Sequence, residues 1–267
     1  MSKVETEDGR IWGYDRYGHS GGKPVLLHHG LIGNSKIGPI WDRLGKENGL
    51  EWIVIERPGY GCTPPMAMKK VVDWPRLITP LLRELGIASR FCAVGLSAGA
   101  PYTYALAAAM PERVSHIAIL SGVPFIQTDG VLEAYPHDGQ TAYARYAVAE
   151  ETTLRAEFGA FCETMLATLP DHPHIEGAVR AILAEDAAGP AREARLQATD
   201  WGFDQDAIRC PVDLWHAPED DMVPFSAASV SALRLSTANW HVQAEPSHFP
   251  SDTTLHQMAR TLANGDA

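Results

Sequence analysis

Residues 91–110 read FCAVGLSAGAPYTYALAAAM and join a short apolar run, a serine between two glycines and a helix-forming stretch. The run FCAVGL is typical of a buried strand, and the residues after Ser97 favour helix. Pro101 agrees with a helix that starts near the serine, because the first helical turn tolerates proline. The stretch therefore predicts a strand, a tight turn and a helix. Gly95 and Gly99 would let strand and helix approach closely around Ser97.

Ser97 has two interpretations. In the first it is a nucleophile presented on a strained turn, as in other G-x-S-x-G sequences that join a strand to a helix. In the second the residues are small only because a helix packs closely on a sheet there. A serine hydroxyl is a weak nucleophile at neutral pH and needs a base. The rest of the sequence has to decide between the two.

Strands and helices alternate through much of the chain. Besides the strand that precedes Ser97, short apolar runs rich in β-branched residues predict strands at 11–17, 25–28, 51–56, 114–120, 212–216 and 240–244. Helical patterns lie between or after them at 41–48, 74–85, 97–110, 226–235 and 253–263. This alternation predicts an α/β fold, a mainly parallel central sheet with helices on both faces.

Residues 125–203 interrupt the alternation. They favour helix, mainly over 141–158, 161–169 and 175–187, with no clear buried strand. We expect a helical lid inserted into a core made of residues 1–124 and 204–267, above the edge where α/β sheets bind ligands. Its aromatic residues either line an apolar pocket or, as the alternative, pack in a core: Phe125, Tyr135, Tyr143, Tyr146, Phe158, Phe161 and Trp201.

Two later loops carry polar side chains. The sequence LWHAPEDDMVP, residues 214–224, leaves a strand and contains Glu219, Asp220 and Asp221; His248 follows the last predicted strand. The carboxyl ends of parallel strands share one edge, so both loops should open beside Ser97. A base and an acid are then available to the serine in the chain order serine, acid, histidine.

This order on this kind of sheet resembles the α/β-hydrolase family, and the resemblance covers nearly the whole chain, with the insertion at the usual lid position. Family members often carry Gly-x-x-Asp-x-x-Val-Pro at the acid. Residues 217–224 match that pattern with alanine in place of glycine, which identifies Asp220 as the acid. Asp221 remains an alternative because the glycine is missing. The resemblance makes His248 the base.

The resemblance also implies an oxyanion hole. The backbone N–H groups of Leu31 and Ala98 would donate to the oxyanion, and His29 and Gly30 would support the loop that holds Leu31. Ala98 lies where a helix starts, and the helix dipole there favours negative charge. Residues 56–63, ERPGYGCT, resemble the family's Asp-Arg-x-Gly-x-Gly-x-Ser loop and are given a structural role.

The activity that the resemblance implies is hydrolysis of a carboxylic ester, thioester or lactone of a small, largely apolar substrate, through an acyl-enzyme on Ser97. Dehalogenases and epoxide hydrolases of the family carry aspartate at this turn. Two alternatives stay open because a fold does not define an activity: a non-catalytic ligand-binding or scaffold protein, and a lyase or perhydrolase with the same triad.

Composition limits the partners and the compartment. The 267 residues include 33 acidic and 22 basic ones, for a formal net charge of −11. Such a surface repels phosphate backbones and anionic lipids, so we expect a small-molecule substrate and neither nucleic acid nor membrane as partner.

The start, MSKVETEDGR, lacks the apolar core of a signal peptide, and four widely spaced cysteines favour reduced thiols in the cytoplasm. We expect no metal and no cofactor. The oligomeric state is left open.

Overall fold

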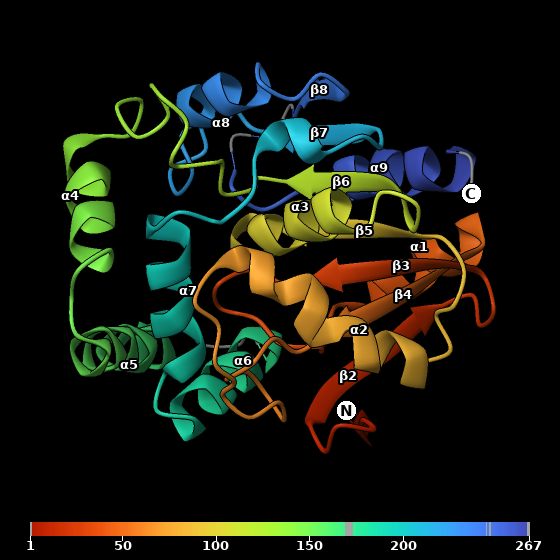
Figure 1. Ribbon diagram of the computed structural model, residues 1–267, viewed down its shortest axis with the longest axis horizontal. Helices are drawn as coiled ribbons and strands as arrows, with labels where there is room; N and C mark the ends of the chain where they lie inside the picture. Colours follow the sequence, from red (N-terminus) through yellow and green to blue (C-terminus); the bar gives the residue numbers. More distant parts are fainter. Residues whose placement is uncertain (1, 169–172, 244, 246, 266–267) are drawn as a thin grey trace.

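An eight-stranded sheet forms the centre of the protein in the computed structural model, which describes residues 2–168, 173–243, 245 and 247–265 (Figure 1). Its order is β1-β2-β4-β3-β5-β6-β7-β8. Strand β2 is antiparallel to β1 and β4, and every pair from β4 to β8 is parallel. The bounds are β1 Ser2–Glu5, β2 Ile11–Gly18, β3 Lys23–His28, β4 Leu50–Ile55, β5 Phe91–Leu96, β6 Val114–Leu120, β7 Val212–His216 and β8 Ala238–Val242. The predicted mainly parallel sheet is confirmed.

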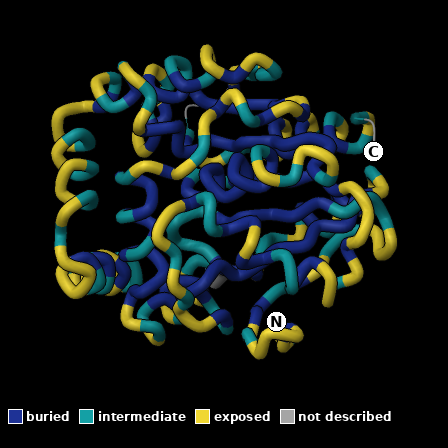
Figure 2. The backbone as a smooth tube through the Cα atoms, in the orientation of Figure 1, coloured by how far each residue is buried: buried dark blue, intermediate teal, exposed yellow. Residues whose placement is uncertain are grey.

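Helices cover both faces of the sheet. Helices α1 (Pro39–Asn48) and α9 (Asp252–Asn264) pack on one face, and α2 (Trp74–Glu84) and α3 (Ala100–Ala109) pack on the other, where α8 (Phe225–Ala232) also contributes. Strands β4, β6 and β7 are buried along their whole length, which agrees with their mainly apolar sequences. Figure 2 shows this buried backbone in the middle of the molecule, with exposed turns around it.

The strand order places a crevice beside β3. The chain runs from β3 to its neighbour β4, then crosses over β3 to β5 on the other side. Loops that leave β3 and β5 at their carboxyl ends therefore diverge, and ligands of open α/β sheets bind at such a point. The β5 loop begins at Ser97 and the β3 loop at His29.

The helices α4 (His137–Tyr146), α5 (Glu151–Thr168), α6 (Pro173–Ala184) and α7 (Ala188–Ala198) form an insertion between the paired strands β6 and β7. In Figure 1 the arrowheads of β3 and β6 point toward the side where these helices lie. The helical insertion has a small apolar core of its own, which includes Leu154, Phe158 and Val179. We name residues 125–203, the segment that contains these four helices, the helical insertion.

The single helix predicted at 141–158 is wrong, since α4 ends and α5 begins within that range. Arg195 of α7 donates hydrogen bonds to the carbonyl oxygens of Tyr146 and Ala149, and so satisfies groups that a continuous helix would have bonded internally. Helix α7 itself was not predicted. Residue 169, the end of another predicted helix, lies outside the described residues.

Smaller differences occur at the ends of elements. The short N-terminal strand β1 was not predicted, and the last strand, predicted at 240–244, spans Ala238–Val242, while residue 244 lies outside the described residues. The helix predicted from residue 97 starts with a 3-10 turn, Ser97–Gly99, and becomes α-helical at Ala100. Within the described residues no helix is both long and apolar enough to span a membrane.

Candidate active site

Ser97 lies directly after β5 with its backbone in the left-handed region, at φ 49°. A side chain with a Cβ atom is strained in this region, at a cost of roughly 1–3 kcal/mol. The surrounding packing must therefore hold the residue in place. The strained turn ends the strand abruptly and leaves the serine half-buried on the wall of a pocket.

The two glycines around Ser97 lie where no side chain fits. A Cβ atom on Gly95 would lie 2.7 Å from the Cα atom of Ala100, and one on Gly99 would collide with the carbonyl oxygen of His28. Both distances are far below van der Waals contact. Glycine at these positions lets β5, α3 and the end of β3 meet at one point.

Below this turn, a buried histidine connects β3 to α3. Trp74 Nε1 donates to His28 Nε2 at 3.1 Å, so His28 Nδ1 carries the proton and donates to Thr103 Oγ1 at 2.8 Å. Burial, together with the nearby charge of Arg57, holds the pKa of His28 well below its ordinary value. The neutral imidazole thus stabilises the base of the turn.

His248 and Asp220 are in direct contact. The Nδ1 atom of His248 lies 3.0 Å and 2.9 Å from the two carboxylate oxygens of Asp220. Oδ1 of Asp220 also accepts the backbone N–H groups of Met222 and Val223, at 2.9 Å and 2.8 Å. Asp220 is buried, whereas Asp221 is exposed. The structure thus brings Asp220, and not its neighbour, to the histidine.

Burial alone would raise the pKa of Asp220. Hydrogen bonds with His216 and His248 and with the Val223 N–H outweigh it and lower the pKa below its ordinary value. The carboxylate is therefore ionised at neutral pH and can accept the Nδ1 proton of His248.

His216 is a contact of Asp220 that the sequence did not reveal. Its Nε2 atom lies 2.8 Å from the carbonyl oxygen of Val223 and 3.3 Å from Oδ2 of Asp220. Its ring also stacks on Trp240, with ring centres 6.0 Å apart. A histidine four residues before the acid, at the end of the same strand, is the only sequence signal for this contact.

A pocket of about 320 Å³ has both Ser97 and His248 in its wall. Its lining is mainly apolar and comes from the loop after β3, from α1, from the ends of β5 and β6, from α6, and from α9 with the residues before it: Ile32, Ile37, Trp41, Leu96, Leu120, Ile175, Ala178, Phe249, Pro250 and Leu255. None of the seven aromatic residues predicted as candidates in the insertion lines it. Six of them pack against other aromatic rings instead, as Phe125 does on Trp201 with ring centres 4.5 Å apart, and Phe161 is exposed. Two aliphatic side chains of α6, Ile175 and Ala178, line the pocket in their place.

The loop after β3 lies beside the serine. A Cβ atom on Gly30 would be 3.7 Å from the Cβ atom of Ser97, and both His29 and Gly30 line the pocket. The side chain of Leu31 packs toward the core of the helical insertion, and Ala98 is buried. Any contribution of Leu31 and Ala98 to the pocket is therefore made by their backbone.

Arg57 holds the loop after β3 in place through hydrogen bonds to its backbone. Its guanidinium donates to the carbonyl oxygens of His29 and Gly30 at 2.6 Å and 3.2 Å, and binds both carboxylate oxygens of Glu193 in α7 at 2.5 Å and 2.9 Å. Arg57 and Glu193 are both fully buried. Burial would lower the pKa of Arg57, but the Glu193 carboxylate raises it above its ordinary value. The pair fastens the helical insertion to the loop beside Ser97.

Replacing Glu193 by glutamine is expected to destabilise the protein by about 3–5 kcal/mol, because Arg57 would then be buried without an opposite charge. Urea unfolding measures this change. The exposed Glu163 of α5 supplies a matched control, since Glu163→Gln makes the same chemical change on the surface and should shift stability by less than about 0.5 kcal/mol. Equal stability of the two variants would show that the buried pair does not hold the insertion.

No group of three or more histidine, cysteine, aspartate or glutamate side chains is arranged to hold a metal ion in the part of the chain that the structure describes.

Solved structures with the same fold are similar over nearly their whole length. The esterase RhEst1 from Rhodococcus sp. ECU1013 has a TM-score of 0.70 at 18% identity, with 98% of each chain covered. The esterase EaEST from Exiguobacterium antarcticum has 0.68 at 19%, covering 98% of this chain and 97% of its own. Est816, an N-acyl homoserine lactone degrading enzyme, has 0.64 at 20%, with 100% of both covered. A search of the curated proteins finds no match.

The sequence itself matches the family model for the alpha/beta hydrolase fold over residues 23–253. That range runs from β3 to the start of α9 and so includes the serine turn, the acid loop and the histidine loop. The observed strand order and the left-handed serine after β5 agree with it. The chain belongs to the α/β-hydrolase fold family.

Proposed function

We propose that the protein is a serine hydrolase, carboxylesterase-like, that cleaves a carboxylic ester, thioester or lactone of a small, largely apolar substrate. The observation that carries the proposal is the shared pocket: Ser97 and His248 both line it, and His248 Nδ1 is bonded to the buried carboxylate of Asp220. A protein that only binds a ligand has no need of this combination.

In the proposed reaction, Nε2 of His248 takes the hydroxyl proton of Ser97 as its oxygen attacks the substrate carbonyl carbon. Asp220 keeps the other ring nitrogen protonated and stabilises the imidazolium. The backbone N–H groups of Leu31 and Ala98 would stabilise the oxyanion, and loss of one such donor typically costs about 10² to 10³ in rate. His248 then protonates the leaving group and activates a water that releases the acid from Ser97.

The pocket favours a small substrate with an apolar part. Its volume of about 320 Å³ is at the lower end of the range for small-molecule sites. Aliphatic side chains of the β3 loop and of α6, such as Ile32 and Ile175, would contact that part. We propose that the helical insertion, residues 125–203, is a lid, and that it contributes to substrate selection. Similar structures include two esterases and a lactone-degrading enzyme, which agrees with ester or lactone chemistry.

A fluorophosphonate probe and a panel of esters test the proposal together. We expect the probe to label the protein covalently, and we expect turnover of p-nitrophenyl esters with acyl chains from acetyl to decanoyl, with a thioester and a lactone measured alongside. Absence of both labelling and turnover would contradict the proposal and favour the non-catalytic alternative. Labelling without any hydrolysis in the panel would favour a lyase or perhydrolase reaction at the same serine.

A further inference from the structure

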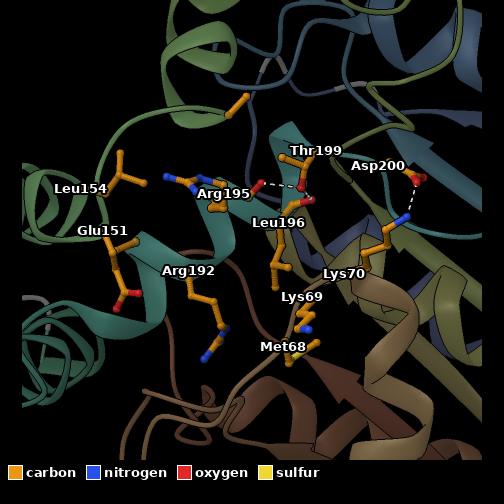
Figure 3. A pocket seen from close by; sticks show the side chains of 12 residues that line it. Met68, Lys69, Lys70, Glu151, Leu154, Arg192, Arg195, Leu196, Thr199 and Asp200 are labelled. Atoms are coloured by element: carbon orange, nitrogen blue, oxygen red, sulfur yellow. Dashed lines mark hydrogen bonds and ion pairs between the residues drawn. The ribbon is translucent and has the colours of Figure 1, made fainter.

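A second cavity of about 460 Å³ lies between α7 and the loop at residues 68–70. Residues from the region of α4 and α5 close one side of it, and it shares no lining residue with the pocket at Ser97. In Figure 3, Arg192, Arg195 and Leu196 come from α7, while Met68, Lys69 and Lys70 come from the loop on the other wall.

The cavity has an excess of positive charge. Four cationic side chains line it, Lys69, Lys70, Arg192 and Arg195, against two acidic ones, Glu151 and Asp200. Both acids already have partners: Asp200 binds Lys70 at 2.5 Å, and Glu151 binds Arg155 at 2.6 Å. Within the described residues, Lys69 has no ion pair. A positive cavity is unexpected in a chain with a formal net charge of −11.

Arg192 has hydrogen-bond donors without acceptors. Its side chain is only 12% exposed, and one end of the guanidinium donates to the carbonyl oxygen of Pro58. Nε and Nη2 find no hydrogen-bond partner among the described residues. The nearest carboxylate oxygen, on Glu193, is 3.6 Å from Nη2 and already binds Arg57. Both nitrogens are buried inside the protein, so Arg192 acts on the cavity through its positive charge and not through accessible donors.

The rest of the wall is apolar. Leu154 and Leu196 are buried side chains of the wall, and Met68 faces them from the loop. Arg195 uses its guanidinium to bind the carbonyl oxygens of Tyr146 and Ala149, and within the part of the chain that the structure describes it has no carboxylate partner. The cavity therefore combines positive charge with apolar surface, which suits a ligand that has an anionic end and a hydrocarbon part.

We propose that this cavity is a binding site for a small organic anion, a carboxylate or phosphate carried on an apolar group. Arg192 and Arg195 place positive charge on the α7 wall of the cavity, where it attracts the anionic oxygens. Lys69 adds charge from the opposite wall, and the apolar residues contact the hydrocarbon part. This site does not depend on the reaction proposed at Ser97. A bound anion would join the loop at residues 68–70 to α7.

Isothermal titration calorimetry with hexanoate and with hexyl phosphate tests the site, with hexanol and hexylammonium as matched ligands without negative charge. We expect both anions to bind, the uncharged and positive ligands not to bind, and the affinity to fall as salt increases. Inorganic phosphate measures what the apolar part contributes. The preference between hexanoate and hexyl phosphate identifies the anionic group.

Substitutions locate the binding. Lys69→Gln and Arg192→Gln should each weaken anion binding about 10-fold or more, as expected for loss of a charged partner. Lys3→Gln, the same change at an exposed lysine that does not line the cavity, should leave it unaltered. Lys69 is exposed, so its variant tests the site even if the Arg192 variant does not fold. No binding to the parent protein, or binding that both variants retain, would overturn the proposal. Ser97→Ala should keep full affinity for the anion, which separates this site from the catalytic pocket.

Discussion

Replacing Ser97 by alanine is expected to lower the turnover of a hydrolysed ester by about 10⁶-fold and to abolish labelling by a fluorophosphonate. The hydroxyl is the proposed nucleophile, and nothing else in the pocket wall supplies one at that position. Alanine keeps the Cβ atom that already occupies this left-handed position, so the turn and the fold should persist. Steady-state kinetics, with mass spectrometry of the labelled protein, measures both effects.

Ser121 offers a matched control for this experiment. It follows β6 as Ser97 follows β5, and it also has a left-handed backbone, at φ 47°. Its hydroxyl is buried and accepts a hydrogen bond from Gln243 at 3.3 Å, and Ser121 does not line the pocket. Ser121→Ala should keep labelling and most of the turnover. If the Ser121 variant lost both and the Ser97 variant kept both, the nucleophile would be assigned to the wrong strand.

The second large effect is expected at the acid. Asp220→Asn should lower turnover by about 10⁴-fold. The amide of asparagine can donate a hydrogen bond to Nδ1 of His248, and the ring proton then lies on Nε2. Because Nε2 must be unprotonated to accept the proton of Ser97, this tautomer cannot act as the base. The asparagine has nearly the same shape and can still accept the backbone N–H groups of Met222 and Val223. Kinetics with one ester, at equal folded concentration, measures the change.

Asp221→Asn provides the comparison within the same loop. Asp221 is exposed and next in sequence, so its substitution should change turnover by only a few-fold. The reverse result, a collapse for Asp221→Asn and little change for Asp220→Asn, would place the acid one residue later. It would also contradict the contact between Asp220 and His248.

Local patterns carried the fold prediction because the parallel strands are short, mainly apolar runs separated by helix-forming stretches. Such patterns failed in the helical insertion. The break between α4 and α5 depends on Arg195, which lies far along the chain and bonds the carbonyl oxygens of Tyr146 and Ala149. The aromatic residues of the insertion carried no signal that distinguishes a pocket wall from a core, and the structure packs Phe125 on Trp201 away from the serine.

What the sequence by itself determined is the set of features that adjacent residues specify: the strand, the glycine-flanked turn and the helix around Ser97, the parallel sheet, and the order of the serine, acid and histidine loops. Only the tertiary structure decided which side chains meet. It joins Arg57 to Glu193 across 136 residues, adds His216 to the surroundings of Asp220, and brings Arg192 and Lys69 into the wall of one cavity. The physical reason is that hydrogen bonds and buried charges depend on distance in space, whereas the strand and helix patterns depend on the period of neighbouring residues.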